Sequence, residues 1–407
     1  MEDSSIDNFL DATQMLHDLS INDKENIDEI LPDNDDNIDT NIDYPYIVFK
    51  RDDLIRTMNL TSKLIQVRSD IISYNSISFI PDIDKKLIYF CATNELSYFK
   101  YSAELIGEPS KMLDRSFSIP LLILQKLVKL MGNKILLYIK DNNLYIRLLD
   151  GDLLLDLREV NTKILDFPGT ISDKLADLNL NSFGKIIDNI MPLLNGEIRG
   201  ETRKIQFTGS KAYYNSSFYY LESDITTPRM SISYRDADFI DKLYKYYSDK
   251  QIQVFSVKSK SNINRIMIKL DNVEYEFINS VNSISDILVD QMHKMISDIE
   301  AIIDFNKLYR TVVLATNLPS STGNISLQFS EDKLKASITS NKGSSDFNFS
   351  IKKEKDKLYN KEIIIRAETL RRLLSSFTEY DNIGIALSDL GITISYNGTK
   401  AVLMHTN

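Results

Sequence analysis

Histidine and cysteine are scarce in this chain. It has three histidines, His17, His293 and His405, which lie far apart in the sequence, and a single cysteine, Cys91. A zinc site needs about four such ligands, and a Cys/His dyad needs both residue types together, so neither is expected. One cysteine also excludes a disulfide framework within the chain and suits a reducing compartment.

Sequence motifs for nucleotide binding and for membrane insertion are missing as well. There is no Walker phosphate loop and no Gly-x-Gly-x-x-Gly after a predicted strand. No apolar run approaches the roughly 20 residues of a membrane helix, and the N-terminus is acidic where a signal peptide is basic. Asp150-Gly151-Asp152 lies between predicted strands, where Asp-Gly is the usual hairpin turn. We therefore expect a cytoplasmic protein that is not an enzyme and holds no metal or cofactor.

Charge is divided unevenly along the 407 residues. Residues 1–43 contain fourteen Asp or Glu and one Lys, whereas the remainder carries a net charge of +3. The acidic tail has little apolar content and is predicted to be disordered. It is interpreted as a solubilising tail, with two alternatives: a mimic of DNA charge, or a docking segment around an amphipathic stretch at 6–21. A basic body with an acidic tail is a hint of nucleic-acid contact.

The stretch 119–159 changes its hydrophobic period in a way that predicts one helix followed by three strands. Apolar residues recur at intervals of three and four from Leu124 to Met131, which is typical of a helix with one buried face. Turn residues at 141–143 and 150–151 then separate three apolar strands.

The same arrangement recurs at 236–279 and at 366–404. The apolar stripes begin at Leu124, Ile240 and Leu370, which are 116 and 130 residues apart, a spacing suited to a small domain. A further helix and three or four strands precede each unit. We predict an α+β protein of three tandem copies of one domain, each with two helices packed on antiparallel sheets. The expected domains are 44–166, 167–290 and 291–407. Outside the three units, strands are predicted at 46–49, 76–80, 86–92, 97–106, 204–208, 211–214, 217–222, 324–329, 333–339 and 346–352.

Lysine and arginine lie beside the apolar stripe of each predicted helix. In the second helix of every domain they form a pair at one place relative to the stripe: Lys126 and Lys129, Lys242 and Lys245, Arg371 and Arg372. The first helices carry Arg56 and Lys63, then Lys185, then Lys307 and Arg310. For any single helix an ordinary solvated face explains the pattern, but three repeated pairs in a row would line one surface. Such a row suits sequence-independent contact with DNA phosphates.

With three such domains, the chain resembles the beta subunit of bacterial DNA polymerase III, the sliding clamp of DNA replication. The resemblance covers 44–407. Val48–Ile65 is similar to the family's first strand and helix, and Leu165–Pro168 to the close of its first domain. Arg310–Leu314 is similar to the first helix of its third domain, and Val402–Met404 to its last strand.

The resemblance implies a ring. In that family two crescent-shaped subunits close around duplex DNA, with helices lining the hole and sheets outside. It further implies a clamp-loader ATPase that opens the ring, and a DNA polymerase or other partner that docks at the junction of the second and third domains through a short apolar peptide.

Individual residues follow from the same resemblance. Arg68 falls where the family has an arginine that contacts DNA, and Arg199 is a second candidate. The implied partner-peptide pocket contains Phe218, Tyr220, Val402, Leu403 and Met404. The implied homodimer interface places Leu155 and Leu157 against Val313 and Leu314, with core packing as the alternative for each residue taken singly.

The chain also departs from the family. Asn-Ser-Ser-Phe-Tyr-Tyr at Asn215–Tyr220 replaces the family's Thr-Asp-Gly-His-Arg-Leu run, and Arg199–Thr202 replaces Arg-Tyr-Tyr-Leu. After Met404 the chain ends in His405–Asn407 where the family continues Pro-Met-Arg-Leu. These replacements favour a virus- or phage-encoded clamp with its own polymerase. The alternative is a clamp-fold scaffold, or an accessory protein of transcription or replication, that does not encircle DNA.

Overall fold

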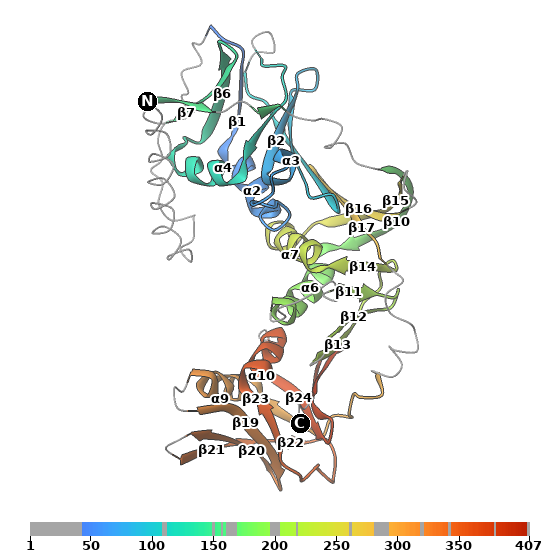
Figure 1. Cartoon of the computed structure of the whole chain (residues 1–407). Coiled ribbons are helices and arrows are strands. Elements are labelled where there is room, and N and C mark those ends of the chain that lie inside the picture. Colours follow the sequence, from blue (N-terminus) through green and yellow to red (C-terminus); the bar gives the residue numbers. More distant parts are fainter. Residues whose placement is uncertain are drawn as a thin grey trace. The chain divides into compact units, whose positions relative to one another are not determined.

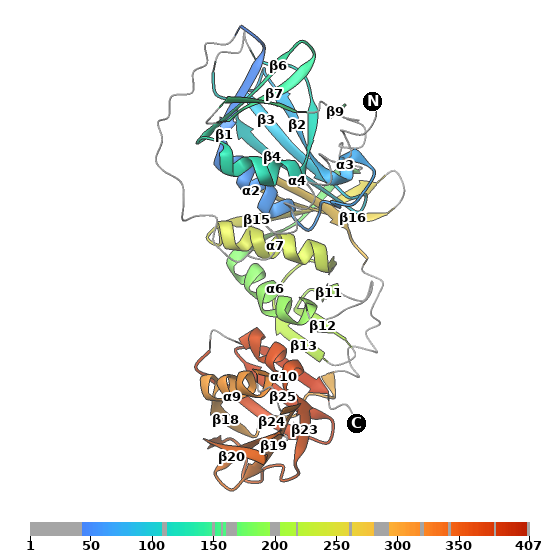
Figure 2. The same cartoon turned by 60° about the vertical axis from the view of Figure 1, so that its left-hand side comes forward.

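Antiparallel strands are the commonest secondary structure among the described residues, and short helices lie beside them (Figures 1 and 2). The computed structural model describes residues 43–107, 112–148, 151–155, 158–159, 169–195, 204–216, 219–259, 263–280, 293–317, 321–340, 343–377 and 380–404. Within these residues the strands form two four-stranded and two nine-stranded sheets.

The first four-stranded sheet has the order β1-β6-β7-β8. Its strands are β1 (Tyr46–Lys50), β6 (Lys134–Lys140), β7 (Asn143–Leu148) and β8 (Gly151–Leu155). Asp141 and Asn142 both have positive φ between β6 and β7, as the two-residue turn of a tight hairpin requires. The outer side of β1 is hydrogen-bonded by the backbone of Ile106 and Leu113. Among the described residues no strand pairs with the far side of β8, so β8 is an edge.

The first nine-stranded sheet joins distant parts of the chain. Its order is β10-β15-β16-β17-β4-β3-β2-β5-β9. The strands are β10 (Gly169–Asn179), β15 (Gln251–Ser259), β16 (Asn264–Leu270), β17 (Val273–Ile278), β4 (Ser97–Glu104), β3 (Leu87–Thr93), β2 (Ser76–Asp82), β5 (Phe117–Pro120) and β9 (Arg158–Glu159). The joint is the antiparallel pairing of β17 with β4, in which Tyr275 lies opposite Phe99.

The second nine-stranded sheet repeats this plan further along the chain. Its order is β14-β11-β12-β13-β26-β25-β24-β18-β22. The strands are β14 (Met230–Ser233), β11 (Lys204–Phe207), β12 (Lys211–Asn215), β13 (Tyr219–Asp224), β26 (Thr399–Met404), β25 (Gly391–Tyr396), β24 (Asn382–Ser388), β18 (Ala301–Asp304) and β22 (Lys352–Lys353). Here the joint is the pairing of β13 with β26.

The last sheet has the order β21-β20-β19-β23. Its strands are β21 (Gly343–Ser350), β20 (Lys333–Ser340), β19 (Ser321–Ser330) and β23 (Ile363–Arg366). Phe347 and Phe349 of β21 lie opposite the buried Ala336 and Leu334 of β20, so they face the core. Within the described part of the chain β21 pairs on this one side only.

Each of the six longer helices begins at the residue after a strand and buries the predicted apolar stripe. They are α2 (Arg51–Thr61), α4 (Leu121–Leu127) with the 3-10 turn η2 (Val128–Leu130), α6 (Leu180–Asn195), α7 (Tyr234–Tyr247), α9 (Phe305–Asn317) and α10 (Ala367–Leu374) with the turn η4 (Ser375–Phe377); a four-residue helix, α3, spans Ile72–Asn75. Helices α6 and α7 approach so closely that a Cβ at Gly184 would lie 2.4 Å from Cβ of Tyr244, which only glycine permits.

The predicted helices and strands are found close to their expected positions, and the structure adds strands that were not predicted. β5, β14, β18 and β23 are four residues long and run straight into a helix, too short to show a period of two. β10 lies at a sheet edge with most of its side chains exposed, so its sequence lacks apolar alternation.

Candidate nucleic-acid interface and partner surface

The cations predicted to contact DNA fall into two groups. Five are exposed, and their side chains make no hydrogen bond or ion pair with any other described residue: Lys63, Arg68, Lys126, Lys129 and Arg310. The others are held by groups of the same chain, except Arg199, which lies outside the described residues. Exposure of a lysine or arginine therefore does not by itself make its charge available.

On α7 both lysines are paired with carboxylates one helical turn earlier. Lys242 Nζ lies 2.7 Å from Asp238 Oδ2 and also donates to Ser62 Oγ at 2.6 Å. Lys245 Nζ lies 2.8 Å from Asp241 Oδ2 and 3.3 Å from Asp188 Oδ1 of α6. Burial raises the pKa of the Asp241 carboxyl to about 6, with Asp188 adding to the rise and Lys245 opposing it.

The arginines of α10 share one acid. Arg371 donates to both carboxylate oxygens of Glu368, at 2.8 and 2.9 Å, and Arg372 Nε donates to Glu368 at 3.0 Å. The hydrogen bond from Arg371 is the main cause that lowers the pKa of Glu368. On α9, Lys307 Nζ lies 3.5 Å from Asp304, although the lysine side chain is largely exposed.

Arg56, predicted as a DNA contact of the first helix, is not fully exposed. It is half-buried, donates to the hydroxyls of Tyr101 and Tyr247 at 3.1 and 3.2 Å, and lies over the Tyr247 ring. Lys185 similarly lies over the ring of Tyr380, at 5.8 Å from its centroid. These contacts join segments that are remote in sequence.

A polar joint between α2 and α7 was not visible in the sequence. Arg56, Asn59 and Ser62 succeed one another at intervals of three along α2 and its C-terminal cap, and they contact Tyr247, Tyr246 and Lys242 of α7, in that order. The spacing puts all three on one face of α2. Two of the predicted DNA contacts, Arg56 and Lys242, therefore belong to this joint.

The residues predicted for the partner pocket do not all share one surface. Tyr220, Val402 and Met404 pack with Tyr213 and Ile296 in a small cluster on the outer face of β12, β13 and β26. Leu403 follows Val402 in an extended strand, so it faces the opposite side and lies in the main core. Phe218 lies outside the described residues.

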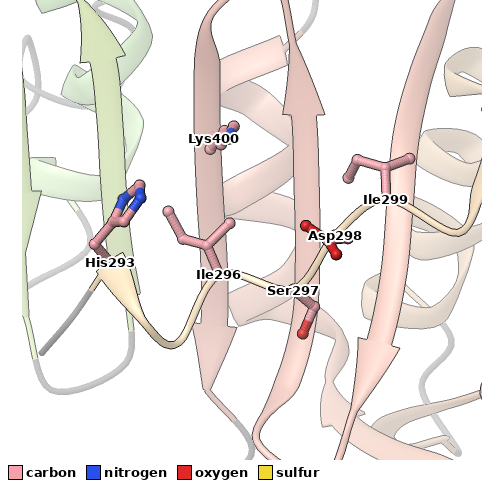
Figure 3. A pocket seen from close by; sticks show the side chains of 6 residues that line it. All are labelled: His293, Ile296, Ser297, Asp298, Ile299 and Lys400. Carbon is pink, nitrogen blue, oxygen red and sulfur yellow. The ribbon is translucent and has the colours of Figure 1, made fainter.

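The segment His293–Glu300 covers this cluster. It crosses the outer face of the second nine-stranded sheet, in the direction from β13 towards β24 (Figure 3). The Ser297 amide donates to Thr393 Oγ1 of β25, and the side chain of Ile299 lies against Gly384 of β24. Because Ile296 packs on them, Tyr220 and Val402 are only 1 % exposed and do not form an open pocket floor.

A buried carboxylate anchors the start of this segment. Glu222 accepts hydrogen bonds from Lys211 Nζ and Tyr220 Oη and is 2.9 Å from His293 Nδ1. Burial alone would raise the pKa of Glu222, but the bonds from His293, Lys211 and Tyr220 outweigh it and hold the pKa below its ordinary value. Glu222 therefore stays ionised at neutral pH and binds the segment to β12 and β13.

Two hollows flank the crossing segment. One of about 170 Å³ is lined by His293, Ile296, Lys400 and their neighbours (Figure 3). The other, of about 600 Å³, shares Asp298 and Ile299 with the first and extends over β24. Neither was predicted, since His293–Glu300 shows no regular period that would place it on a sheet.

The residues predicted for the dimer interface differ in their exposure. Leu155 is only 6 % exposed and belongs to the main core, which is the alternative stated for it. On the same edge strand Leu153 and Leu154 are 38 % and 55 % exposed. Leu314 of α9 is 42 % exposed, Val313 is half-buried, and Leu157 lies outside the described residues.

Among the described residues no group of His, Cys, Asp and Glu is placed to hold a metal ion. Asp152, one half of the Asp-Gly-Asp sequence, accepts from Arg147 and from the Tyr138 hydroxyl. No helix in the described part of the chain has the length and apolar character needed to cross a membrane.

Comparison with known proteins leads to one fold. No protein-family model and no curated protein matches the sequence. Solved structures do match, including the sliding clamp (DNA polymerase III subunit beta) of Bartonella birtlesii, in a structure with griselimycin bound, at 14% identity and a TM-score of 0.73, over 89% of this chain and 100% of that one. The beta subunits of Thermotoga maritima and Streptococcus pyogenes match at 12% and 11% identity with TM-scores of 0.72 and 0.70, each over 89% of this chain and at least 99% of the other. At such identities the likeness establishes the fold.

Proposed function

We propose that this chain, which has the fold of the DNA polymerase III beta subunits, is a DNA sliding clamp. Two copies would close into a ring around duplex DNA and tether a polymerase or another partner to it. The chain would be divided into the three domains 44–166, 167–290 and 291–407. It would act in the cytoplasm, without catalysis and without a metal or cofactor.

The observation that carries the proposal is the pair of free sheet edges. Both joints within the chain are made in one way, by antiparallel pairing of strands from distant segments: β17 with β4, and β13 with β26. The two remaining sheets each have four strands, and among the described residues β8 is an edge strand of one and β21 an edge strand of the other. Pairing β8 of one copy with β21 of a second would make a third joint of the same kind. Two such joints close a dimer.

Side chains at these edges suit that pairing. Leu153 lies opposite the buried Ile146, so it points to the inner face at a position where no neighbouring strand covers it. Phe347 on β21 also points to the inner face. An apolar edge with unpaired backbone groups favours association with another strand, and ring closure would cover both edges.

The mechanism would be topological. A closed ring keeps its partner at high effective concentration near the DNA, so each phosphate contact can be weak enough to allow sliding. Opening the ring would need a separate clamp-loader ATPase, since the sequence has no phosphate loop. A partner peptide would dock in the hollows beside His293–Glu300, the segment that covers Tyr220 and Val402. The replacements within Asn215–Tyr220 support a virus- or phage-encoded member with a polymerase of its own.

Retention on circular DNA tests the proposal. The protein is loaded on nicked circular duplex, with a clamp loader if spontaneous loading fails, and washed at high salt, and the DNA is then linearised. A ring stays on the circle and slides off the linear form, whereas a protein bound through contacts alone behaves identically on both. Equal retention on the two forms would refute encirclement.

Substitution at the sheet edge tests closure. Leu153→Asp places a charge where the two copies would meet, and the exposed position should leave the fold intact, in contrast to the buried Leu155. We expect light scattering to give a dimer for the native chain and a monomer for the variant. Leu122→Asp, at an exposed leucine of α4, is the matched control and should stay dimeric. An unchanged mass of the Leu153 variant would place the interface elsewhere.

The second candidate is a clamp-fold scaffold that does not encircle DNA. It is favoured by the neutralisation of the α7 and α10 cations by Asp238, Asp241 and Glu368. A monomer that shows no preference for circular over linear DNA would support it.

A further inference from the structure

Helix α4 with the turn η2, helix α7 and helix α10 each carry a pair of cations, but they differ in their acids. On α7, Asp238 and Asp241 precede Lys242 and Lys245 by four residues each. On α10, Glu368 precedes Arg371 and Arg372 by three and four residues. Helix α4 and the turn η2, with the sequence Leu-Leu-Ile-Leu-Gln-Lys-Leu-Val-Lys-Leu, contain no acid at all.

We infer that the contacts with duplex DNA are uneven: Lys126 and Lys129, with Lys63 and Arg68, supply the main phosphate contacts, whereas nearby acids neutralise the lysines of α7 and partly neutralise the arginines of α10. The inference rests on the proposed function, since it names the residues by which the clamp contacts DNA. Helix α2, which Lys63 and Arg68 follow, lies beside α4 in both views of the molecule (Figures 1 and 2). Arg310 of α9 is the fifth exposed cation without a partner among the described residues, and the other cation of its helix, Lys307, is paired with Asp304.

Burial of their acidic partners explains why the lysines of α7 are not available to DNA phosphates. The side chains of Asp238 and Asp241 are 11 % and 10 % exposed, so solvent screens them poorly. If Lys242 turned to a phosphate, it would leave the largely desolvated Asp238 carboxylate without its counter-charge and would also break its bond to Ser62. This exchange of partners gains little free energy, because a phosphate only replaces a carboxylate beside the lysine.

In charge compensation, helix α10 lies between α4, which has no acid, and α7, whose lysines are each paired. Glu368 is 44 % exposed, and one carboxylate serves two guanidinium groups. Its charge is screened by water and compensates only one of the two positive charges. Arg371 and Arg372 together thus keep about one unit of charge, which is less than Lys126 and Lys129 keep.

The salt dependence of DNA affinity measures these differences directly. For a non-specific ligand, log K falls against log salt with a slope of about 0.9 per phosphate neutralised. Binding of the full-length native dimer to a short fluorescent duplex is followed by anisotropy over a range of salt concentrations. The matched variants are Lys126→Gln with Lys129→Gln, and Lys242→Gln with Lys245→Gln, which share the same spacing and remove the same charge.

We expect the α4 variant to lower the magnitude of the slope by about 1.8, since two contacts are lost, and the α7 variant to leave it nearly unchanged. Conversely, Asp238→Asn with Asp241→Asn should raise the magnitude of the slope by up to about 1.8, because two lysines become available. Glu368→Gln should raise it by about 0.9. Thermal melting and light scattering confirm that each variant remains folded and dimeric. The Asn variant retains every lysine, so it still tests the inference if the α7 Gln variant unfolds.

Two results would overturn the inference while leaving the clamp intact. One is an equal loss of slope in the α4 and α7 Gln variants, and the other is an unchanged slope after the change of Asp238 and Asp241 to Asn. Failure of the native dimer to bind duplex DNA even at low salt would also overturn the inference, whereas the proposed function is decided separately by retention on circular against linear DNA.

Discussion

A buried ion pair beside the joint of β4 and β17 yields the most specific stability prediction. Arg265 of β16 forms an ion pair with Glu276, its diagonal neighbour on β17, and the two side chains are 4 % and 0 % exposed. Arg265 also donates to the carbonyl of Leu96, 2.8 Å away in the turn before β4, and lies over the ring of Tyr98. The pair thus connects the two segments that the sheet brings together.

The expected magnitudes follow from desolvation. Arg265→Met removes one partner and leaves the Glu276 carboxylate in an apolar site, at a cost of about 3–5 kcal/mol in the free energy of unfolding. Oε2 of Glu276 has no hydrogen-bond partner among the described residues, so the native pair already carries an unsatisfied atom. Replacing both residues together, Arg265→Met with Glu276→Leu, should therefore be neutral or stabilise the protein by about 1–4 kcal/mol.

The pH dependence of stability provides a further check on the Arg265→Met variant. Burial raises the pKa of Glu276, and Arg265 opposes that rise. Without the arginine the folded-state pKa should rise further above the unfolded value. The variant should then regain stability as the pH falls through that pKa, because the protonated acid is the form that tolerates burial.

Urea unfolding of the native chain, both single variants and the double variant completes a double-mutant cycle. Hydrogen exchange of the β4 and β17 amides locates the loss at the joint. A cost below about 1 kcal/mol for Arg265→Met, or a double variant as unstable as the sum of the single ones, would show that solvent reaches the pair and that the reasoning from burial is wrong.

Two further predictions concern α7 and the crossing segment. Because burial raises the pKa of Asp241 to about 6, above its unfolded value, the folded protein binds the extra proton and gains stability as the pH falls from 7 towards 5. Asp241→Asn should flatten this part of the stability profile in thermal melts, and an identical profile would contradict the assignment. In Gly384→Ala the new Cβ would lie 2.9 Å from Cγ2 of Ile299, so the segment His293–Glu300 should lift from the sheet at a cost of about 1–3 kcal/mol. Faster hydrogen exchange of the Ser297 amide would report this, and unchanged exchange would show that Ile299 simply rotates away.

The sequence by itself determined the helices, most strands and the threefold recurrence, because hydrophobic period is a local property. The stripe that begins at Leu124 predicts α4 without any knowledge of its neighbours, and it is buried as expected. The ion pairs of α7 could also have been predicted from the sequence, because Asp238 precedes Lys242 by one helical turn. The short strands and the exposed edge strand β10 escaped prediction because they carry too few alternating residues to show a period.

Tertiary structure alone decided which predicted site residues are available. Whether Arg56 meets solvent depends on Tyr101 and Tyr247, and whether Tyr220 forms a surface depends on Ile296, which lies dozens of residues away. Leu153 and Leu155 point to the same face of one edge strand, yet Leu155 is 6 % exposed and Leu153 is 38 % exposed. Burial and charge compensation are properties of contacts between distant segments, and hydrophobic period along the chain contains no record of them.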